Sequence, residues 1–122
     1  MQKRGKGARD EHGKWDIGAG GIEVGDSIQK SLSKEILEEY GTEILEYEFL
    51  GFREIFREHK GRPTHWLAFD FKVKVDPKKA KNNEPHKFED VRWFSKDSMP
   101  EPAQAHSQLP FFLKKYAERL WK

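Results

Sequence analysis

The chain has 122 residues, of which 35% are hydrophobic and 13% aromatic, enough apolar material for one small domain with a packed core. Charged residues make up 36% of the sequence, but both signs are interleaved and the net charge is only +2, which argues against a nucleic-acid binder. The absence of cysteine excludes disulfide and thiol chemistry. No apolar run approaches the roughly 18 residues that span a bilayer and no secretory signal precedes the first charges, so we expect a cytoplasmic protein without a membrane partner.

The first third of the chain predicts a loop followed by a helix. Residues 1–14 are rich in Gly, Lys, Arg and Asp and are expected to form a loop. A short extended piece then runs into a group of glycines. Asp26 or Ser27 is suited to cap a helix that ends at Tyr40, and Gly41 fits the left-handed position that often follows a helix.

The rest of the chain predicts strands and a closing helix. Residues 43–57 are rich in Phe, Tyr and Ile, a hairpin turn follows at 58–63, and alternating side chains indicate a second strand at 64–75. Residues 88–94 predict one more strand. The apolar residues of the last segment have helical spacing and predict an amphipathic helix that covers the core: Leu109, Phe112, Leu113, Tyr116 and Leu120.

The stretch KEILEEYG places Glu35, Glu38 and Glu39 on the first predicted helix, although like charges at this spacing destabilise an isolated helix. On a helical wheel, Glu35 and Glu39 fall within about 20° of the edge of an apolar arc, whose members are Ile28, Leu32, Ile36 and Tyr40. Burial of such carboxylates is unfavourable unless they are paired or bind a metal, and magnesium prefers hard oxygen ligands. The alternative is a solvated acidic face paired with Lys30 and Lys34.

The spacing around these glutamates resembles the Nudix box, G-x5-E-x7-R-E-U-x-E-E-x-G-U, where U is a bulky aliphatic residue, over residues 20–42. Three positions depart from the pattern, since Asp26 replaces Glu, Lys34 replaces Arg and Thr42 replaces an aliphatic residue. The resemblance extends over most of the chain. It implies a single α+β domain over residues 1–122, built as a Nudix-like α/β/α sandwich with a mixed β-sheet between helices.

The Nudix resemblance also implies a magnesium site, with manganese as an alternative ion. The implied metal ligands are Glu35, Glu38, Glu39 and the backbone carbonyl of Ala19. Glu35, Glu38 and Lys34 would carry the catalytic roles, with Lys34 orienting Glu35. Asp26 and Gly20 would support the ligands, because a glycine lets the backbone approach the metal and phosphates closely.

The activity implied by the resemblance is hydrolysis of a nucleoside diphosphate linked to a group X, with water attacking a phosphorus of the pyrophosphate. The EPHK loop and the small size favour a nucleoside triphosphate or a modified nucleotide. The alternatives are an ADP-ribose or nucleotide-sugar pyrophosphatase, a catalytically weak nucleotide-binding module, or a plain acidic helix in an unrelated fold. The residues expected to contact the substrate are Arg4, Arg9, Trp66 and Glu84.

The Nudix resemblance implies one or two strands before the segment QKRG, and we expect this chain to lack them. The loss of such a strand would expose the edge of the sheet, and exposed edges tend to pair with other chains. A homodimer is one arrangement that would cover this edge.

Overall fold

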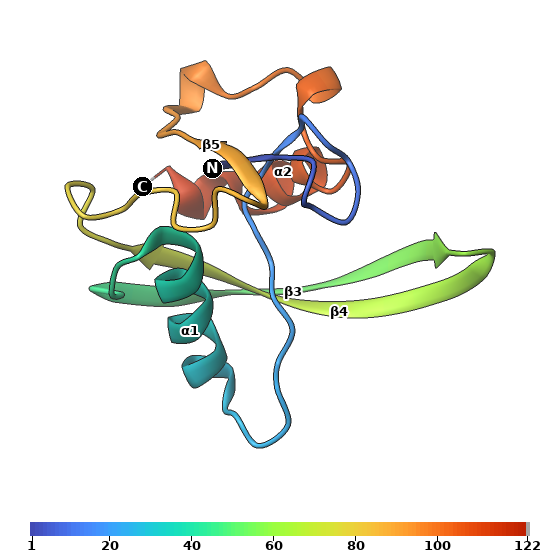
Figure 1. Ribbon diagram of the computed structural model, residues 1–122, viewed down its shortest axis with the longest axis horizontal. Coiled ribbons are helices and arrows are strands. Elements are labelled where there is room, and N and C mark those ends of the chain that lie inside the picture. The colour runs from blue at the N-terminus through green and yellow to red at the C-terminus, as the bar shows by residue number, and fades with distance from the viewer. Residues whose placement is uncertain (122) are drawn as a thin grey trace.

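The computed structural model describes residues 1–121 and shows strands and helices in an α+β arrangement (Figure 1). The predicted α+β class is therefore confirmed. None of the helices in the described range combines the length and apolar character needed to cross a membrane. The elements in chain order are β1 (Gln2–Arg4), β2 (Trp15–Asp16), α1 (Ile28–Tyr40), β3 (Glu46–His59), β4 (Arg62–Lys74), β5 (Phe88–Val91), the 3-10 helices η1 (Lys96–Ser98) and η2 (Pro102–Gln104), and α2 (Leu109–Leu120).

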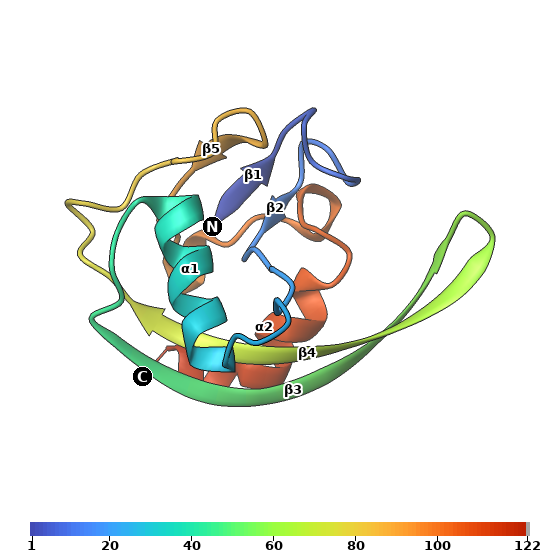
Figure 2. The ribbon, with the colours of Figure 1, turned by 60° about the horizontal axis from the view of Figure 1, so that its bottom comes forward.

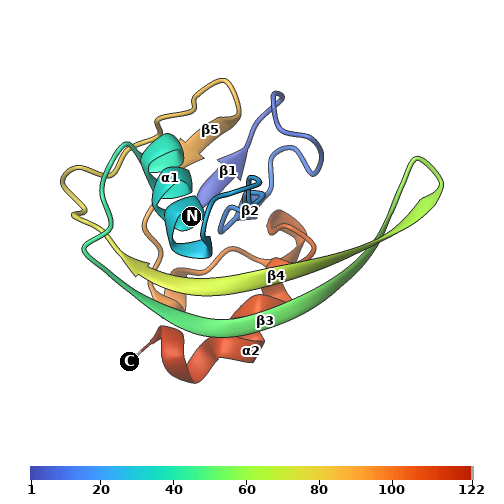
Figure 3. The same cartoon turned by 90° about the horizontal axis from the view of Figure 1, so that it is seen from below.

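Within residues 1–121 the strands form two antiparallel sheets. Strand β1 lies between β2 and β5, as Figure 2 shows, and β3 pairs with β4 in a long hairpin. The predicted mixed sheet is wrong for the described strands, because every pair of them is antiparallel. The parallel contact between Trp15 and Ala105 is an isolated bridge. In Figure 3 the hairpin passes between α1 and α2, which gives the predicted layering of helices on both sides of a sheet.

The prediction that residues 1–14 form only a loop is wrong. Gln2 pairs with Asp16 of β2 on one side and with Val91 of β5 on the other, so β1 is a central strand. The short polar segment QKR carries no apolar alternation that would identify a strand. Backbone pairing with two strands that are distant in the sequence is what orders it.

Helix α1 begins and ends at the residues that the sequence indicates. The Ser27 side-chain oxygen accepts a hydrogen bond from the Lys30 backbone N–H at 3.1 Å, which confirms Ser27 as the N-cap. Gly41 has a φ of 66°, and its N–H donates to the Leu37 carbonyl at 2.9 Å. This left-handed residue satisfies one of the free carbonyls at the helix end.

The most buried positions of α1 differ from those of the predicted apolar arc. Ser31 and Glu39 are buried, whereas Ile28 is 40% exposed. Ser31, Glu35 and Glu39 follow one another at four-residue spacing and therefore lie along one side of the helix. The helical wheel correctly placed the glutamates beside the apolar arc, but the tertiary partners decide which side is covered.

The side of the β3–β4 hairpin that contacts α2 is marked by a buried polar network. Arg53 binds the Asp70 carboxylate through two nitrogens, at 2.7 and 3.0 Å, and the Tyr116 hydroxyl of α2 donates to Asp70 at 2.8 Å. The apolar side chains on the other face of β4 remain partly exposed, with Leu67 at 57% and Phe69 at 44%. The hairpin therefore buries its charged pair under α2.

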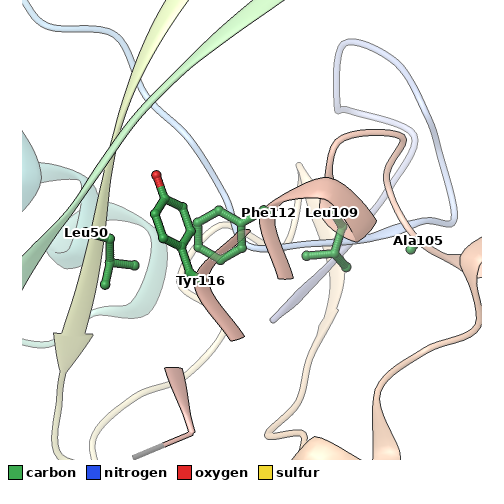
Figure 4. Close-up of a cluster of buried hydrophobic side chains, with 5 residues drawn as sticks. All are labelled: Leu50, Ala105, Leu109, Phe112 and Tyr116. Atoms are coloured by element: carbon green, nitrogen blue, oxygen red, sulfur yellow. The ribbon is translucent and has the colours of Figure 1, made fainter. Parts of the chain in front are cut away.

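Helix α2 supplies most of the buried apolar cluster drawn in Figure 4. Its predicted role as the helix that covers the core is therefore confirmed. Met1, Ile17, Leu113 and Leu120 pack against the cluster and are partly buried. The members of the cluster are Leu50, Ala105, Leu109, Phe112 and Tyr116.

Candidate active site

The glycine loop before α1 packs directly against the side chain of Glu35. A Cβ atom built on Gly20 would lie 2.0 Å from the Glu35 carboxyl carbon and 2.1 and 2.4 Å from its two oxygens. Such distances are shorter than any normal contact, so the Glu35 carboxylate could not keep its position beside a larger residue. Because Gly20 has no side chain, the loop backbone can approach this carboxylate closely.

Glu39 meets the same loop one helical turn further along α1. A Cβ on Gly18 would lie 2.9 Å from Oε2 of Glu39 and 2.7 Å from Oε1 of Gln2. Gly18 has a φ of 85°, a conformation that favours glycine. Ala19 lies between Gly18 and Gly20, so its backbone belongs to the segment that contacts Glu35 and Glu39.

The carboxylates of this helix are in an environment that disfavours negative charge. Burial, followed by repulsion from Glu35, raises the pKa of Glu39 to about 8. Burial, followed by repulsion from Glu38, also raises the pKa of Glu35. The charge of Glu84 raises both pKa values further, whereas that of Lys87 lowers them. A nearby cation would therefore favour the ionised form of these carboxyl groups.

The residues present fit a divalent cation. Oε1 of Glu39 is buried and has no hydrogen-bond partner among residues 1–121. Glu35 and Glu38 line a small hollow of about 20 Å³ beside the loop. Carboxylate oxygens are the hard ligands that magnesium and manganese prefer. A cation at these glutamates would satisfy the orphaned oxygen and reduce the repulsion between the carboxylates.

Lys34 does not contact Glu35 in the way that the sequence pattern implied. Its ammonium group lies 2.9 Å from Oδ2 of Asp26 and 3.1 Å from Oε2 of Glu23. These hydrogen bonds, with Asp26 first, raise the pKa of Lys34 to about 12, and the bond from Lys34 is the main cause that lowers the pKa of Asp26. A lysine has a single compact charge, and here its ion pairs with Asp26 and Glu23 connect α1 to the preceding loop.

Glu84 is brought to the site by a loop that binds the carboxyl-terminal end of α1. The backbone N–H groups of Lys81 and Asn83 donate to the carbonyls of Tyr40 and Glu39, each at 3.0 Å. The Asn83 side-chain amide donates to the Glu38 carbonyl at 3.1 Å. The sequence did not indicate this role for Asn83, because its partners are more than forty positions away.

The other predicted substrate residues are placed less favourably. The Arg4 guanidinium donates to the backbone and side chain of Asp10, at 2.9 and 3.1 Å, and lies 3.5 Å from Asp16. Arg9 is exposed in the loop between β1 and β2. Trp66 is 55% exposed and alternates onto the Asp70 face of β4, on the α2 side of the hairpin. Trp66 is therefore not brought to the α1 glutamates.

A second group of potential metal ligands lies away from α1. Asp10, Glu11 and His106 have ligand atoms within 4.8 Å of one another. His106 Nε2 lies 2.7 Å from Oε2 of Glu11, which also accepts a hydrogen bond from the Ser107 hydroxyl at 3.0 Å. Arg57 lies 3.4 Å from both Asp10 and Glu11. These contacts already satisfy the carboxylates, so the group joins two loops and the β3 strand.

The fold and the site define an α+β domain in which a glycine loop covers the carboxylates of a single helix. The sequence matches the family model described as NUDIX domain over residues 1–115, and the chain belongs to the NUDIX family. NUDIX domains are, in general, hydrolases of pyrophosphate bonds and use divalent metal ions. The class of chemistry is therefore hydrolysis of a phosphoric anhydride.

Proposed function

We propose that this chain is a magnesium-dependent pyrophosphohydrolase whose substrate is a nucleoside triphosphate or a modified nucleotide. Manganese is the alternative ion. The observation that carries the proposal is the pair Glu35 and Glu39, whose carboxylates lie against Gly20 and Gly18 with raised pKa values. Carboxylates whose ionised form is disfavoured by burial are suited to a metal ion, whose positive charge favours that form, and to the phosphates that accompany the ion.

In this proposal Glu35, Glu38 and Glu39 supply oxygen ligands, together with the backbone carbonyl of Ala19. A bound divalent ion supplies charge neutralisation for the phosphate oxygens and acidifies water. Glu35 orients the attacking water and accepts its proton. Water then forms a bond to phosphorus, and the bond from phosphorus to the bridging oxygen breaks. Glu84 is the second candidate for the proton acceptor.

The loop after Glu84 carries a lysine, Lys87, whose positive charge is compatible with a phosphate-rich substrate. The charge of Lys87 lowers the pKa values of both Glu35 and Glu39 and so favours their ionised forms. A lysine at that position can contact a substrate phosphate as a point charge. Lys34 and Asp26 keep the start of α1 attached to its loop and act on the site through that attachment.

The first test is release of phosphate, pyrophosphate or nucleotide from a panel of nucleoside triphosphates, ADP-ribose, nucleotide sugars and dinucleoside polyphosphates. Each compound is tested with magnesium, with manganese and with EDTA. Glu39→Gln removes a proposed ligand, and Glu43→Gln is the matched control on an exposed glutamate just beyond the helix. The expected result is turnover that requires the metal, is lost in Glu39→Gln and is retained in Glu43→Gln.

The same panel separates the alternatives. Turnover of ADP-ribose or a nucleotide sugar in preference to triphosphates would replace the proposed substrate class. Metal-dependent nucleotide binding without turnover would indicate the binding module, which the contact of Lys34 with Asp26 instead of Glu35 favours. A folded protein that neither binds nor hydrolyses any of these compounds would contradict the proposal.

Two further expectations stay predictions. The first is a cytoplasmic location. The second is a homodimer, for which the partly exposed aromatic side chains of the hairpin, including Phe49 at 50% and Phe52 at 55%, offer an apolar surface. Sedimentation velocity over a range of protein concentrations would distinguish a dimer from a monomer.

A further inference from the structure

Gln2 is a buried polar residue that the proposed reaction does not use. Its relative exposure is 0%, and neither its side-chain nitrogen nor its side-chain oxygen has a hydrogen-bond partner among the described residues. A buried amide without partners is unfavourable, because it loses its hydrogen bonds to water without replacement. If the side chain at this position only filled space, an apolar side chain of similar size would make the fold more stable than Gln2 does.

The position of Gln2 links it to the carboxylate site. Strand β1 is the central strand of its sheet, and Gln2 pairs with Asp16 and Val91 on its two sides. Its side-chain oxygen lies 2.7 Å from the point where a Cβ on Gly18 would be, and Oε2 of Glu39 lies 2.9 Å from the same point. The amide of Gln2 and the carboxylate of Glu39 therefore lie close to each other beside Gly18.

We propose that Gln2 is a positioning residue of the metal site, whose side-chain N–H donates a hydrogen bond to the Glu39 carboxylate. The inference rests on the proposed function, because it assigns Glu39 as a metal ligand. Half a turn about the last side-chain bond exchanges the oxygen and nitrogen of the amide, and this places the N–H groups on the Glu39 side. Gln2 then determines which Glu39 oxygen remains available as a ligand.

The physical basis is the way in which proteins hold ligating carboxylates. A carboxylate that binds a metal is usually held by a hydrogen bond to its other oxygen, and removal of that donor typically weakens metal binding by about 10–100-fold. Oε2 of Glu39 is the oxygen that lies beside the Gln2 amide at Gly18, and Gln2 has a donor without an acceptor in the described part of the chain. A hydrogen bond from Gln2 to Oε2 leaves Oε1, which is buried and has no partner among the described residues, as the oxygen for the metal.

The test compares Gln2→Met with the wild type in two measurements that do not require turnover. One is binding of Mn²⁺ to the substrate-free protein, followed by electron paramagnetic resonance. The other is urea unfolding in EDTA. We expect at least a tenfold weaker Mn²⁺ affinity in Gln2→Met with an equal or higher midpoint of unfolding, because the orphaned amide is replaced by an apolar side chain of similar size.

Two further variants sharpen the result. Lys3→Met is the matched control, since Lys3 is the next residue of β1 and its ammonium pairs with Glu89 at 3.5 Å on the strand's other face. It should bind Mn²⁺ like the wild type. Gln2→Leu replaces Gln2→Met should the latter fail to fold.

The outcomes separate this inference from the proposed function. If the wild type and Glu39→Gln bind Mn²⁺ equally, the metal site itself is wrongly assigned. If Glu39→Gln loses Mn²⁺ and Gln2→Met retains it, the proposed function stands and the role of Gln2 is refuted. Weak binding in both variants, with a stable metal-free Gln2→Met, supports both assignments.

Discussion

The carboxylate of Glu35 occupies the space in which a side chain on Gly20 would lie, since a Cβ there would be 2.0 Å from the carboxyl carbon. This contact couples the loop to the helix at the proposed metal ligand. It also gives a physical reason for glycine at this position that does not depend on an unusual backbone conformation. The next glycine, Gly21, differs, because a Cβ on it would meet no atom within 4 Å in the described residues.

Gly20→Ala is expected to weaken metal binding without unfolding the protein. The new methyl group displaces the end of a flexible side chain, so the fold adjusts while the Glu35 carboxylate leaves its position. We expect a loss of at least about tenfold in Mn²⁺ affinity, which corresponds to about 1.4 kcal/mol. Titration of the metal and thermal unfolding in EDTA measure the two effects separately.

Gly21→Ala is the matched control for this prediction, since it adds the same methyl group one residue further along the loop. Its metal affinity and its midpoint of unfolding should stay close to those of the wild type. Equal metal affinity in Gly20→Ala and Gly21→Ala would show that the position of Glu35 does not matter for binding.

Without metal, the free energy of unfolding should fall as the pH rises from about 4.5 to about 8. The pKa of Glu39 is raised from 4.5 to about 8 in the folded protein, mainly by burial, so the folded state holds a proton that the unfolded state has already released. The associated stability is fully present below the lower value and is lost as the pH passes the upper one. Glu35 acts in the same direction because its pKa is also raised.

Chemical unfolding in EDTA at several pH values measures this dependence, and Glu39→Gln should flatten much of it. The same substitution should make the metal-free protein more stable than the wild type at pH 8. Glu43→Gln serves again as the control and should keep the wild-type slope. Magnesium should stabilise the wild type more at pH 8 than at pH 6, because the metal competes with the proton. A stability that rises with pH over this range would contradict the burial of Glu39.

Asn83→Ala is expected to loosen the loop that holds Glu84 beside α1. The side chain of Asn83 donates to the Glu38 carbonyl, and its loss should lower the free energy of unfolding by about 1 kcal/mol. The rate of hydrolysis should also fall, because Glu84 then loses its fixed position near the other carboxylates. Urea unfolding and steady-state kinetics provide the two numbers.

Lys79→Ala is the comparison for Asn83→Ala, since Lys79 is exposed on the same loop and its side chain makes no contact with α1 among the hydrogen bonds and ion pairs of residues 1–121. It should leave both stability and rate nearly unchanged. Similar kinetics in the two variants would mean that Asn83 contributes to stability alone.

Asp70→Ala is expected to destabilise the fold strongly. Removal of Asp70 leaves the buried Arg53 guanidinium without its partner, and breaking a buried ion pair in this way costs about 3–5 kcal/mol.

Tyr116→Phe removes one hydrogen bond to the same carboxylate and should cost about 1.5–3 kcal/mol. Urea unfolding measures both variants. Tyr47→Phe, at a tyrosine that is 45% exposed, should have little effect and controls for loss of a hydroxyl group.

Much of α1 could be predicted because its signals are local. Ser27 accepts a hydrogen bond from the Lys30 N–H in the first turn, and Gly41 takes the left-handed conformation after the last turn. Both residues are adjacent in the sequence to the helix whose start and end they define. The position of Glu35 and Glu39 on one side of α1 was predictable for the same reason, since residues four apart on one helix lie on the same side. The partner of Lys34 was not predictable, because two acidic residues of the preceding loop compete with Glu35 for its ammonium group.

The hairpin shows where the sequence pattern was insufficient. The alternation in residues 64–75 correctly indicated β4 (Arg62–Lys74), but an alternation defines two faces without saying which one is covered. Asp70 lies on the covered face because Arg53 and Tyr116 satisfy its charge there. The apolar face of Leu67 and Phe69 remains partly exposed.

The sequence by itself determined the α+β class, the bounds of α1 with its Glu35, Glu38 and Glu39, and the apolar side of α2, because each depends on spacing or capping signals within the segment itself. Only the tertiary structure decided that the segment beginning at Gln2 is a central strand and that the loop at Asn83 binds the end of α1. These features consist of hydrogen bonds and buried contacts between segments far apart in the chain. A local pattern cannot encode them, because the free energy of each contact depends on a partner that folding alone brings near.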